Sequence, residues 1–243
     1  MIELESNTWP DATFVCIPAY KAAKDLEKFL PSLLLYVPHD KICIVDDASH
    51  DGTESVCYHF KVECLRQEIN QGKGAALKKG FAQLLNKNAG WILTMDADGQ
   101  HAVNDIPHFL DAVKKYPDAG LVIGARSIKL STMPPARIFS NRVTSAILSL
   151  MCGHKIPDSQ CGFRIYSSEL FKKINLRHKR FEMESEVILK ACSAGFGVRF
   201  IPVQTLYCST QSHISHIKDI LRWIRAVLGV WLELRFSKLS GRT

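Results

Sequence analysis

Two acids separated by one position, Asp96 and Asp98, are the side chains of this 243-residue chain best suited to chemistry, with Gln100 two positions further on. Carboxylate and carbonyl oxygens are the ligands that Mg²⁺ and Mn²⁺ prefer. All three residues follow the apolar run Trp91–Met95, whose composition favours a buried strand. A helix N-cap cluster before Asn104 is the alternative, since Asp and Asn often cap helices. The strand context favours a divalent metal site at Asp96, Asp98 and Gln100.

Polar residues also follow two earlier apolar runs. Pro18 and Tyr20 come at the end of the first run, and an acidic pair that includes Asp47 comes directly after Val45. A carboxylate at such a point can accept hydrogen bonds from base N–H groups or ribose hydroxyls, whereas a tight turn would also use Asp and Ser. Three predicted strand ends therefore carry polar groups.

The segment Asn70–Gly74, which contains Lys73, precedes a helical pattern and resembles a phosphate cradle. It lacks the Walker spacing, so its phosphate-binding interpretation is weak. Helix capping and a tight entry turn are the alternative role of its glycines.

The elements that must position these residues alternate between strand and helix patterns. We expect strands at 13–17, 41–45, 62–65, 91–95, 121–123 and 198–202, and helices at 26–34, 53–60, 74–86, 104–116, 138–151 and 185–194. Buried strands without polar alternation, separated by helices, predict an α/β fold with a mostly parallel sheet flanked by helices. In open α/β sheets, ligands bind outside the carboxyl ends of the strands, where the polar groups above would lie.

Composition supports a globular protein with locally concentrated basic charge. The formal net charge is +7, with 47% hydrophobic and 23% charged residues, values that disfavour disorder and coiled coil. The stretch from Gly120 to Pro157 has five Lys or Arg, among them Arg126 and Arg137, and no acid. This concentration indicates an anionic ligand or surface rather than a solvated face. No stacking aromatics interleave these cations, so nucleic acid is not an expected partner.

Together the motifs resemble those of the inverting GT-A glycosyltransferases of family 2, which have a Rossmann-like fold. The motifs are Pro18-x-Tyr20, Val45-Asp46-Asp47-x-Ser49-x-Asp51-Gly52-Thr53, Asn70-x-Gly72-Lys73-Gly74 and Asp96-Ala97-Asp98-x-Gln100-His101. Later motifs resemble the branch of dolichyl-phosphate mannose synthases and polyprenyl-phosphate glycosyltransferases. They are Gly124-x-Arg126, Asp158-x-x-x-Gly162-Phe163-Arg164, Phe181-Glu182-x-Glu184 and Ile201-Pro202-Val203.

The resemblance implies transfer of a sugar from a GDP- or UDP-linked nucleotide sugar to a polyprenyl-phosphate lipid, with Mg²⁺ or Mn²⁺ as cofactor. The residues it implies for the donor are Pro18, Tyr20, Val45, Asp47, Lys73, Asp96, Ala97, Asp98, Arg126 and His213. The metal would be held by Asp96, Asp98 and Gln100, and the residues implied for catalysis are Asp98, Arg126, Arg137, Asp158 and Arg164. Two departures leave the nucleotide open: Lys21-Ala22 replaces the Asn-Glu that is frequent in the branch, and His213 replaces a Lys.

Two alternative functions remain. A family 2 enzyme that acts on a hydroxyl of another lipid or glycan would need a carboxylate base, for which Asp158 is the candidate. A non-catalytic, nucleotide-sugar-binding membrane scaffold is the second alternative, which the intact acidic motif disfavours. Nucleotidyl transfer is disfavoured because the loop after the first strand has no glycine-rich signature.

The tail from residue 212 to residue 243 is expected to extend a catalytic domain of residues 1–211 as a basic amphipathic helix. It is too polar to span a bilayer. We expect it either to lie on an anionic membrane surface, to pack on the core, or to bind a membrane subunit. The eight cysteines without a C-x-x-C pair and the acidic N-terminus predict a cytoplasmic enzyme, peripherally associated with the cytosolic face of a membrane.

Overall fold

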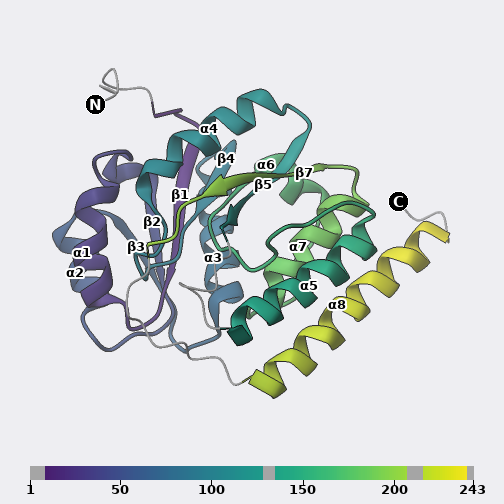
Figure 1. Ribbon diagram of the computed structural model, residues 1–243. Helices are drawn as coiled ribbons and strands as arrows, with labels where there is room; N and C mark the ends of the chain where they lie inside the picture. Colours follow the sequence, from purple (N-terminus) through teal and green to yellow (C-terminus); the bar gives the residue numbers. More distant parts are fainter. Residues whose placement is uncertain (1–8, 128–134, 207–215, 240–243) are drawn as a thin grey trace.

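The structure, a computed structural model, describes residues 9–127, 135–206 and 216–239 (Figure 1). Its centre is a seven-stranded sheet with the strand order β3-β2-β1-β4-β6-β5-β7. The strands are β1 (Thr13–Ala19), β2 (Ile42–Asp46), β3 (Glu63–Arg66), β4 (Trp91–Thr94), β5 (Ala119–Arg126), β6 (Arg164–Ser167) and β7 (Gly197–Val203).

All neighbouring strands pair in parallel except β6, which is antiparallel to both β4 and β5. The predicted mostly parallel sheet is therefore confirmed. The sequence patterns did not predict β6 or the short helix that follows it. The carboxyl ends of β1, β2, β4 and β5 and the amino end of β6 lie at one edge of the sheet, so the loops beyond them converge.

Helices cover both faces of the sheet. In Figure 1, α4 lies on one side of the sheet, whereas α3 and α7 contact each other on the other side. The helices are α1 (Ala23–Leu33), α2 (Thr53–His59), α3 (Lys73–Asn86), α4 (Ile106–Lys115), α5 (Pro135–Cys152), α6 (Ser168–Lys173), α7 (Glu182–Ser193) and α8 (His216–Leu239), and 3₁₀ turns span His39–Lys41 and Val103–Asp105. The helices expected before residue 200 are present with ends shifted by a few residues.

The core lies between the strands and these helices. The strands β1 and β2 are almost entirely buried, as their uninterrupted apolar runs predict. Helix α3 lies unusually close to them at Gly80, where a Cβ atom would overlap the Sγ atom of Cys16 and come within 3.0 Å of Val45. Close packing of α3 fixes the position of its first residue, Lys73, relative to the strand ends.

The C-terminal helix α8 packs on α7 with one side. Val227 and Val230 are buried there, and the Nε1 atom of Trp223 donates a 2.9 Å hydrogen bond to Ser185. Ion pairs between Glu182 and Arg222 and between Arg177 and Glu233 flank this contact. Packing on the core, one of the expected alternatives, is thus present. The predicted domain boundary between residues 211 and 212 lies outside the described residues.

Candidate active site

The carboxylate of Asp47, just beyond β2, organises the loop that leads into α3. It is buried and accepts hydrogen bonds from Nε2 of Gln67 (2.6 Å), the backbone N of Gln71 (2.8 Å) and the backbone N of Gly72 (2.7 Å). Gly72 has a φ of +97°, a region that favours glycine. Asp47 therefore fixes the turn that presents the next residue, Lys73.

The loop after β1 is fastened to the loop after β2. The backbone N atoms of Lys21 and Ala22 donate to the hydroxyls of Ser49 (2.7 Å) and Thr53 (3.2 Å). Tyr20, between Ala19 and Lys21, is 49% exposed, so its ring is accessible. Pro18 is partly buried and Val45 is fully buried, so the Val45 side chain has no exposed surface.

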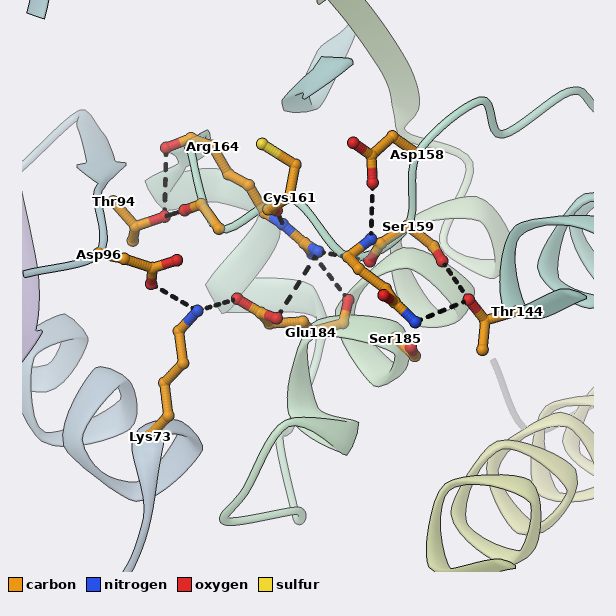
Figure 2. A network of polar contacts seen from close by, with 12 residues as sticks. Lys73, Thr94, Asp96, Thr144, Asp158, Ser159, Cys161, Arg164, Glu184 and Ser185 are labelled. Carbon is orange, nitrogen blue, oxygen red and sulfur yellow. Dashed lines mark hydrogen bonds and ion pairs between the residues drawn. The ribbon is translucent and has the colours of Figure 1, made fainter. Parts of the chain in front are cut away.

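Lys73 lies between two carboxylates from different elements (Figure 2). Its Nζ atom is 2.6 Å from Oδ1 of Asp96, beyond β4, and 2.9 Å from Oε1 of Glu184, in the first turn of α7. Burial would lower the pKa of Lys73, but the charges of Asp96 and Glu184 raise it well above its ordinary value. Lys73 is therefore a permanent cation at this point.

Asp96 and Asp98 have opposite electrostatic surroundings. Burial would raise the pKa of Asp96, but Lys73 and His101, whose Nε2 atom is 3.3 Å from Oδ2, hold it well below its ordinary value. Burial and the neighbouring Asp96 charge raise the pKa of Asp98. The backbone N of Gln100 donates a 3.0 Å hydrogen bond to Asp98. Of the two acids, Asp98 is the one whose ionised form the surroundings disfavour.

Gly162 provides the space for the Asp96–Lys73 ion pair. A Cβ atom at this position would lie 2.5 Å from Oδ2 of Asp96 and 2.8 Å from Nζ of Lys73. The Oγ1 atom of Thr94 donates a 2.8 Å hydrogen bond to the carbonyl of Gly162, which holds the loop against β4. The loop before β6 therefore closes one side of the acidic site.

Arg126, the last residue of β5, forms a bidentate ion pair with Asp158. Its Nε atom is 2.7 Å from Oδ2 and its second terminal nitrogen is 3.1 Å from Oδ1. Asp158 also accepts hydrogen bonds from Nδ2 of Asn141 and the backbone N of Gln160, each at 3.0 Å. Burial would raise the pKa of Asp158, but the Arg126 guanidinium and these N–H groups lower it. Burial would lower the pKa of Arg126, but Asp158 and, to a smaller extent, the charge of Asp96 raise it, so the two ion pairs are electrostatically linked.

Arg164 is fully buried and points into the interior (Figure 2). Its guanidinium donates to the carbonyls of Cys161 (2.7 Å), Glu184 (2.9 Å) and Ser159 (2.8 Å). These bonds hold the loop from Asp158 to Arg164 against the start of α7. Arg164 has no exposed surface and supports the site from behind, whereas the family resemblance implied a catalytic role for it.

The other predicted residues lie in less informative surroundings. Arg137 is half-buried in the first turn of α5, and Ala97 is buried between the two acids. His213, and Lys129 of the basic segment, lie outside the described residues. The sequence motifs included Glu184 without a role, and its contact with Lys73 depends on a long-range pairing that spacing within α7 does not reveal.

Asp96 and Asp98 decide whether this site can hold a divalent cation. Within the described residues, no group of three or more His, Cys, Asp and Glu side chains could hold a metal ion. Mg²⁺ commonly uses one or two carboxylates and completes its shell with phosphate oxygens and water. Asp98, which has no ion-pair partner among the described contacts, and the remaining lone pairs of Asp96 fit that mode of binding, and Gln100 is two residues away.

The chain is similar in sequence to a known protein family and to several named proteins. Residues 14–175 match the model of the family described as glycosyl transferase family 2. A UDP-N-acetylglucosamine–dolichyl-phosphate N-acetylglucosaminyltransferase of Methanococcus voltae is 29% identical over 80% of this chain and 85% of its own length. A polyprenol monophosphomannose synthase of Mycolicibacterium smegmatis is 29% identical over 79% of this chain and 76% of its own length.

Solved structures show the same fold. The glucosyl-3-phosphoglycerate synthase of Mycobacterium tuberculosis, crystallised with Mn²⁺, UDP and phosphoglyceric acid, aligns with a TM-score of 0.70. It is 14% identical, and the alignment covers 91% of this chain and 78% of that chain. The family match extends over the strands and loops that carry Asp47, Lys73, Asp96 and Arg126, and this GT-A chain belongs to glycosyl transferase family 2.

Proposed function

We propose that this glycosyltransferase moves a sugar, with inversion, from a nucleotide sugar to a polyprenyl-phosphate lipid. The observation that carries the proposal is the acidic site beyond β4, where Asp96 is paired with Lys73 and burial beside Asp96 raises the pKa of Asp98. The names of the two relatives above, which describe transfer to dolichyl phosphate and synthesis of a polyprenyl monophosphomannose, supply the acceptor class.

The donor would bind across the loops beyond β1, β2 and β4. The accessible ring of Tyr20 would pack on the base, together with Pro18 and the backbone of Val45. Asp47 would act mainly by fixing the turn at Gly72, since three N–H groups already occupy its carboxylate. The donor would be a GDP- or UDP-linked sugar.

Asp98, with Asp96 and Gln100, would hold Mg²⁺ or Mn²⁺ against the donor diphosphate. A bound divalent cation would neutralise the charge that develops on the departing nucleoside diphosphate. Arg126 and Arg137 would add positive charge near the phosphates, with Arg126 oriented by Asp158. Arg164 would position the loop before β6 without contacting substrate.

The state of Asp158 favours a phosphate acceptor over a hydroxyl acceptor. A hydroxyl nucleophile needs a general base with a pKa near the working pH. Asp158 is held by Arg126, Asn141 and Gln160, and its pKa is lowered, so it is a poor base. A lipid monophosphate needs no such base, because its second pKa is about 6 and its oxygens are anionic at neutral pH. The site then needs only to orient the phosphate in line with the sugar.

A membrane surface would present such a lipid. Within the described residues, no helix is long and apolar enough to cross a bilayer. The side of α8 away from α7 exposes Leu221, Leu228 and Leu232, and the exposed cations Arg225 and Arg235 flank these leucines. Apolar side chains flanked by cations suit the headgroup region of an anionic leaflet, so we place the enzyme at the cytosolic face of a membrane.

The test is an acceptor assay with the full chain. Purified protein with Mn²⁺ is incubated with each of several UDP- and GDP-linked sugars, with and without polyprenyl phosphate, and the nucleoside diphosphate and glycolipid are quantified. We expect release of nucleoside diphosphate in step with formation of a sugar–phosphate lipid of inverted anomeric configuration. Transfer only to hydroxyl acceptors would contradict the proposed acceptor, and donor binding without turnover for any acceptor would favour a scaffold.

A further inference from the structure

The Lys73 ammonium is already paired with Asp96, one of the two acids of the site. The Lys73 ammonium lies 2.6 Å from Asp96 and 2.9 Å from Glu184, with the Lys73 side chain 17% exposed and the Glu184 side chain 8% exposed. A divalent ion that binds Asp96 must therefore approach a carboxylate that Lys73 already neutralises. The resemblance implied donor binding for Lys73 and named no role for Glu184.

We propose that Glu184 is a positioning residue that sets how strongly a divalent cation binds at Asp96, because it draws the competing Lys73 ammonium away from that carboxylate. The inference deepens the proposed function and rests on its metal dependence. When Asp96 binds a divalent cation, Lys73 can keep its ion pair with the second carboxylate, that of Glu184.

The backbone that carries Lys73 and Glu184 is held in place. Any change in the partner of Lys73 must therefore come from movement of the side chains. The backbone N of Ala75 donates a 2.7 Å hydrogen bond to the carbonyl of Lys179, which joins the start of α3 to the segment before α7. At Gly74, a Cβ atom would lie 2.5 Å from the carbonyl oxygen of Arg180, so the two segments touch. Lys73 and Glu184 therefore stay within reach of each other whichever carboxylate the ammonium favours.

Charge decides the direction of the effect. Without the Glu184 charge, Lys73 would bond to Asp96 alone, and the guanidinium of Arg164, 3.9 Å from Oε2 of Glu184, would lose its nearest acid. Both changes oppose a divalent cation at Asp96. Without the Lys73 charge, Asp96 would have no ammonium competitor and would bind the cation more tightly.

Two single variants and their combination separate this role from a structural one. Glu184→Gln should raise the Mn²⁺ dissociation constant at least about tenfold, a change that corresponds to about 1.4 kcal/mol. Lys73→Gln should lower it by a comparable factor, and the double variant should bind Mn²⁺ about as tightly as Lys73→Gln, because Glu184 acts through an ammonium that is then absent. If the ion pairs only stabilise the fold, both single variants should bind Mn²⁺ more weakly and the double variant should not recover.

The measurement is electron paramagnetic resonance of free Mn²⁺, titrated into the full chain with saturating UDP and, separately, GDP. Glu184→Asp retains the charge and should bind Mn²⁺ nearly as the wild type does. Glu182→Gln is the matched control, because Glu182 lies on the same helix and pairs with Arg222 instead. Thermal melting identifies any variant that fails to fold.

The outcomes are distinguishable. If the wild type binds Mn²⁺ but Lys73→Gln binds it no more tightly, or Glu184→Gln binds it equally well, the role of Glu184 is refuted while the proposed function stands. If the wild type binds no Mn²⁺ with either nucleotide, the proposed metal dependence is wrong and this inference fails with it.

Discussion

Asp98 occupies a position where its charge opposes folding. Burial and the Asp96 charge raise its pKa in the folded chain, so its contribution to stability is present at acid pH and is lost as the pH rises through the folded-state pKa. At neutral pH the ionised side chain therefore destabilises the metal-free protein. Destabilising groups of this kind are concentrated at functional sites.

Asp98→Asn should therefore stabilise the protein while removing its activity. Without metal or nucleotide, Tm should rise at pH 7.5, by about 2–4 °C for each kcal/mol gained in the free energy of unfolding, and the gain should shrink as the pH approaches 4. Turnover should fall at least about a hundredfold, the usual cost of losing one charge-stabilising group. Asp111→Asn, at an exposed position of α4, is the control. A lower Tm for Asp98→Asn at pH 7.5 would contradict this account.

Gly162 is the second residue whose identity the site requires. In Gly162→Ala, the new methyl would lie 2.5 Å from Asp96 and would displace either that carboxylate or the loop. Overpacking of this kind costs about 1–3 kcal/mol, and we expect reduced turnover and weaker Mn²⁺ binding in addition. Gly229→Ala, where a Cβ atom meets nothing within 4 Å, should leave both unchanged. Wild-type Mn²⁺ affinity in Gly162→Ala would show that the loop adjusts without disturbing Asp96.

At the scale of elements, the Arg126–Asp158 pair joins the end of β5 to the loop before β6. The Asp158 side chain is 1% exposed and that of Arg126 is 15% exposed, so loss of one charge leaves the other buried without its partner. Asp158→Asn should lower the free energy of unfolding by about 3–5 kcal/mol, as measured by urea denaturation. Asp118→Asn breaks the exposed pair with Arg199 and should cost at most about 1 kcal/mol.

The Arg126–Asp158 pair also predicts that the free energy of unfolding depends on pH. Because the pKa of Asp158 is lowered in the folded chain, its contribution to stability is present at neutral pH and is lost as the pH falls below the ordinary carboxyl range near about 4. The stability difference between the wild type and Asp158→Asn should therefore narrow in acid. An equal difference at pH 7 and pH 3 would mean that the shape of Asp158, not its charge, holds the loop.

Local patterns predicted the parallel strands and their helices because each buried strand is a continuous apolar run. They missed β6 because its four residues begin with Arg164, a residue type that is rarely buried. Only the folded chain supplies the three carbonyls that satisfy the Arg164 guanidinium. The acids at the strand ends were identified from spacing, whereas the partners of Lys73 and Arg126 depend on distant segments that meet only after folding.

At the scale of the whole molecule, α8 has two apolar sides with different environments. One side, with Val227, Val230 and Trp223, is covered by α7. The other exposes Leu221 and Leu228, at 63% and 44%. Helix α5, which also packs on α7, exposes Phe139 and Leu150. Exposed leucines along a helix whose other side is already packed need a further explanation, and a membrane surface provides one.

Deletion of residues 217–243 would not test this explanation cleanly, because it would also uncover α7. Substitution of residues on the exposed side of α8 alone is a sharper test. In the triple variant Leu221→Gln, Leu228→Gln, Leu232→Gln, we expect wild-type Tm and donor binding, together with at least about tenfold weaker binding to vesicles that contain anionic lipid. Each of the three side chains should lose most of the roughly 1.5–3 kcal/mol gained when a Leu leaves water, so tenfold is a lower limit.

The dependence of vesicle binding on salt concentration separates its apolar contribution from its electrostatic one. Arg225 and Arg235 should each add about 1 kcal/mol near an anionic surface, a contribution that is screened at high ionic strength. Vesicle flotation of an Arg225→Gln, Arg235→Gln variant should therefore match that of the wild type at high salt and fall below it at low salt. If the wild-type chain fails to float with anionic vesicles even at low salt, the exposed leucines of α8 bind another protein subunit instead, and activity on long-chain acceptors should then depend on that subunit.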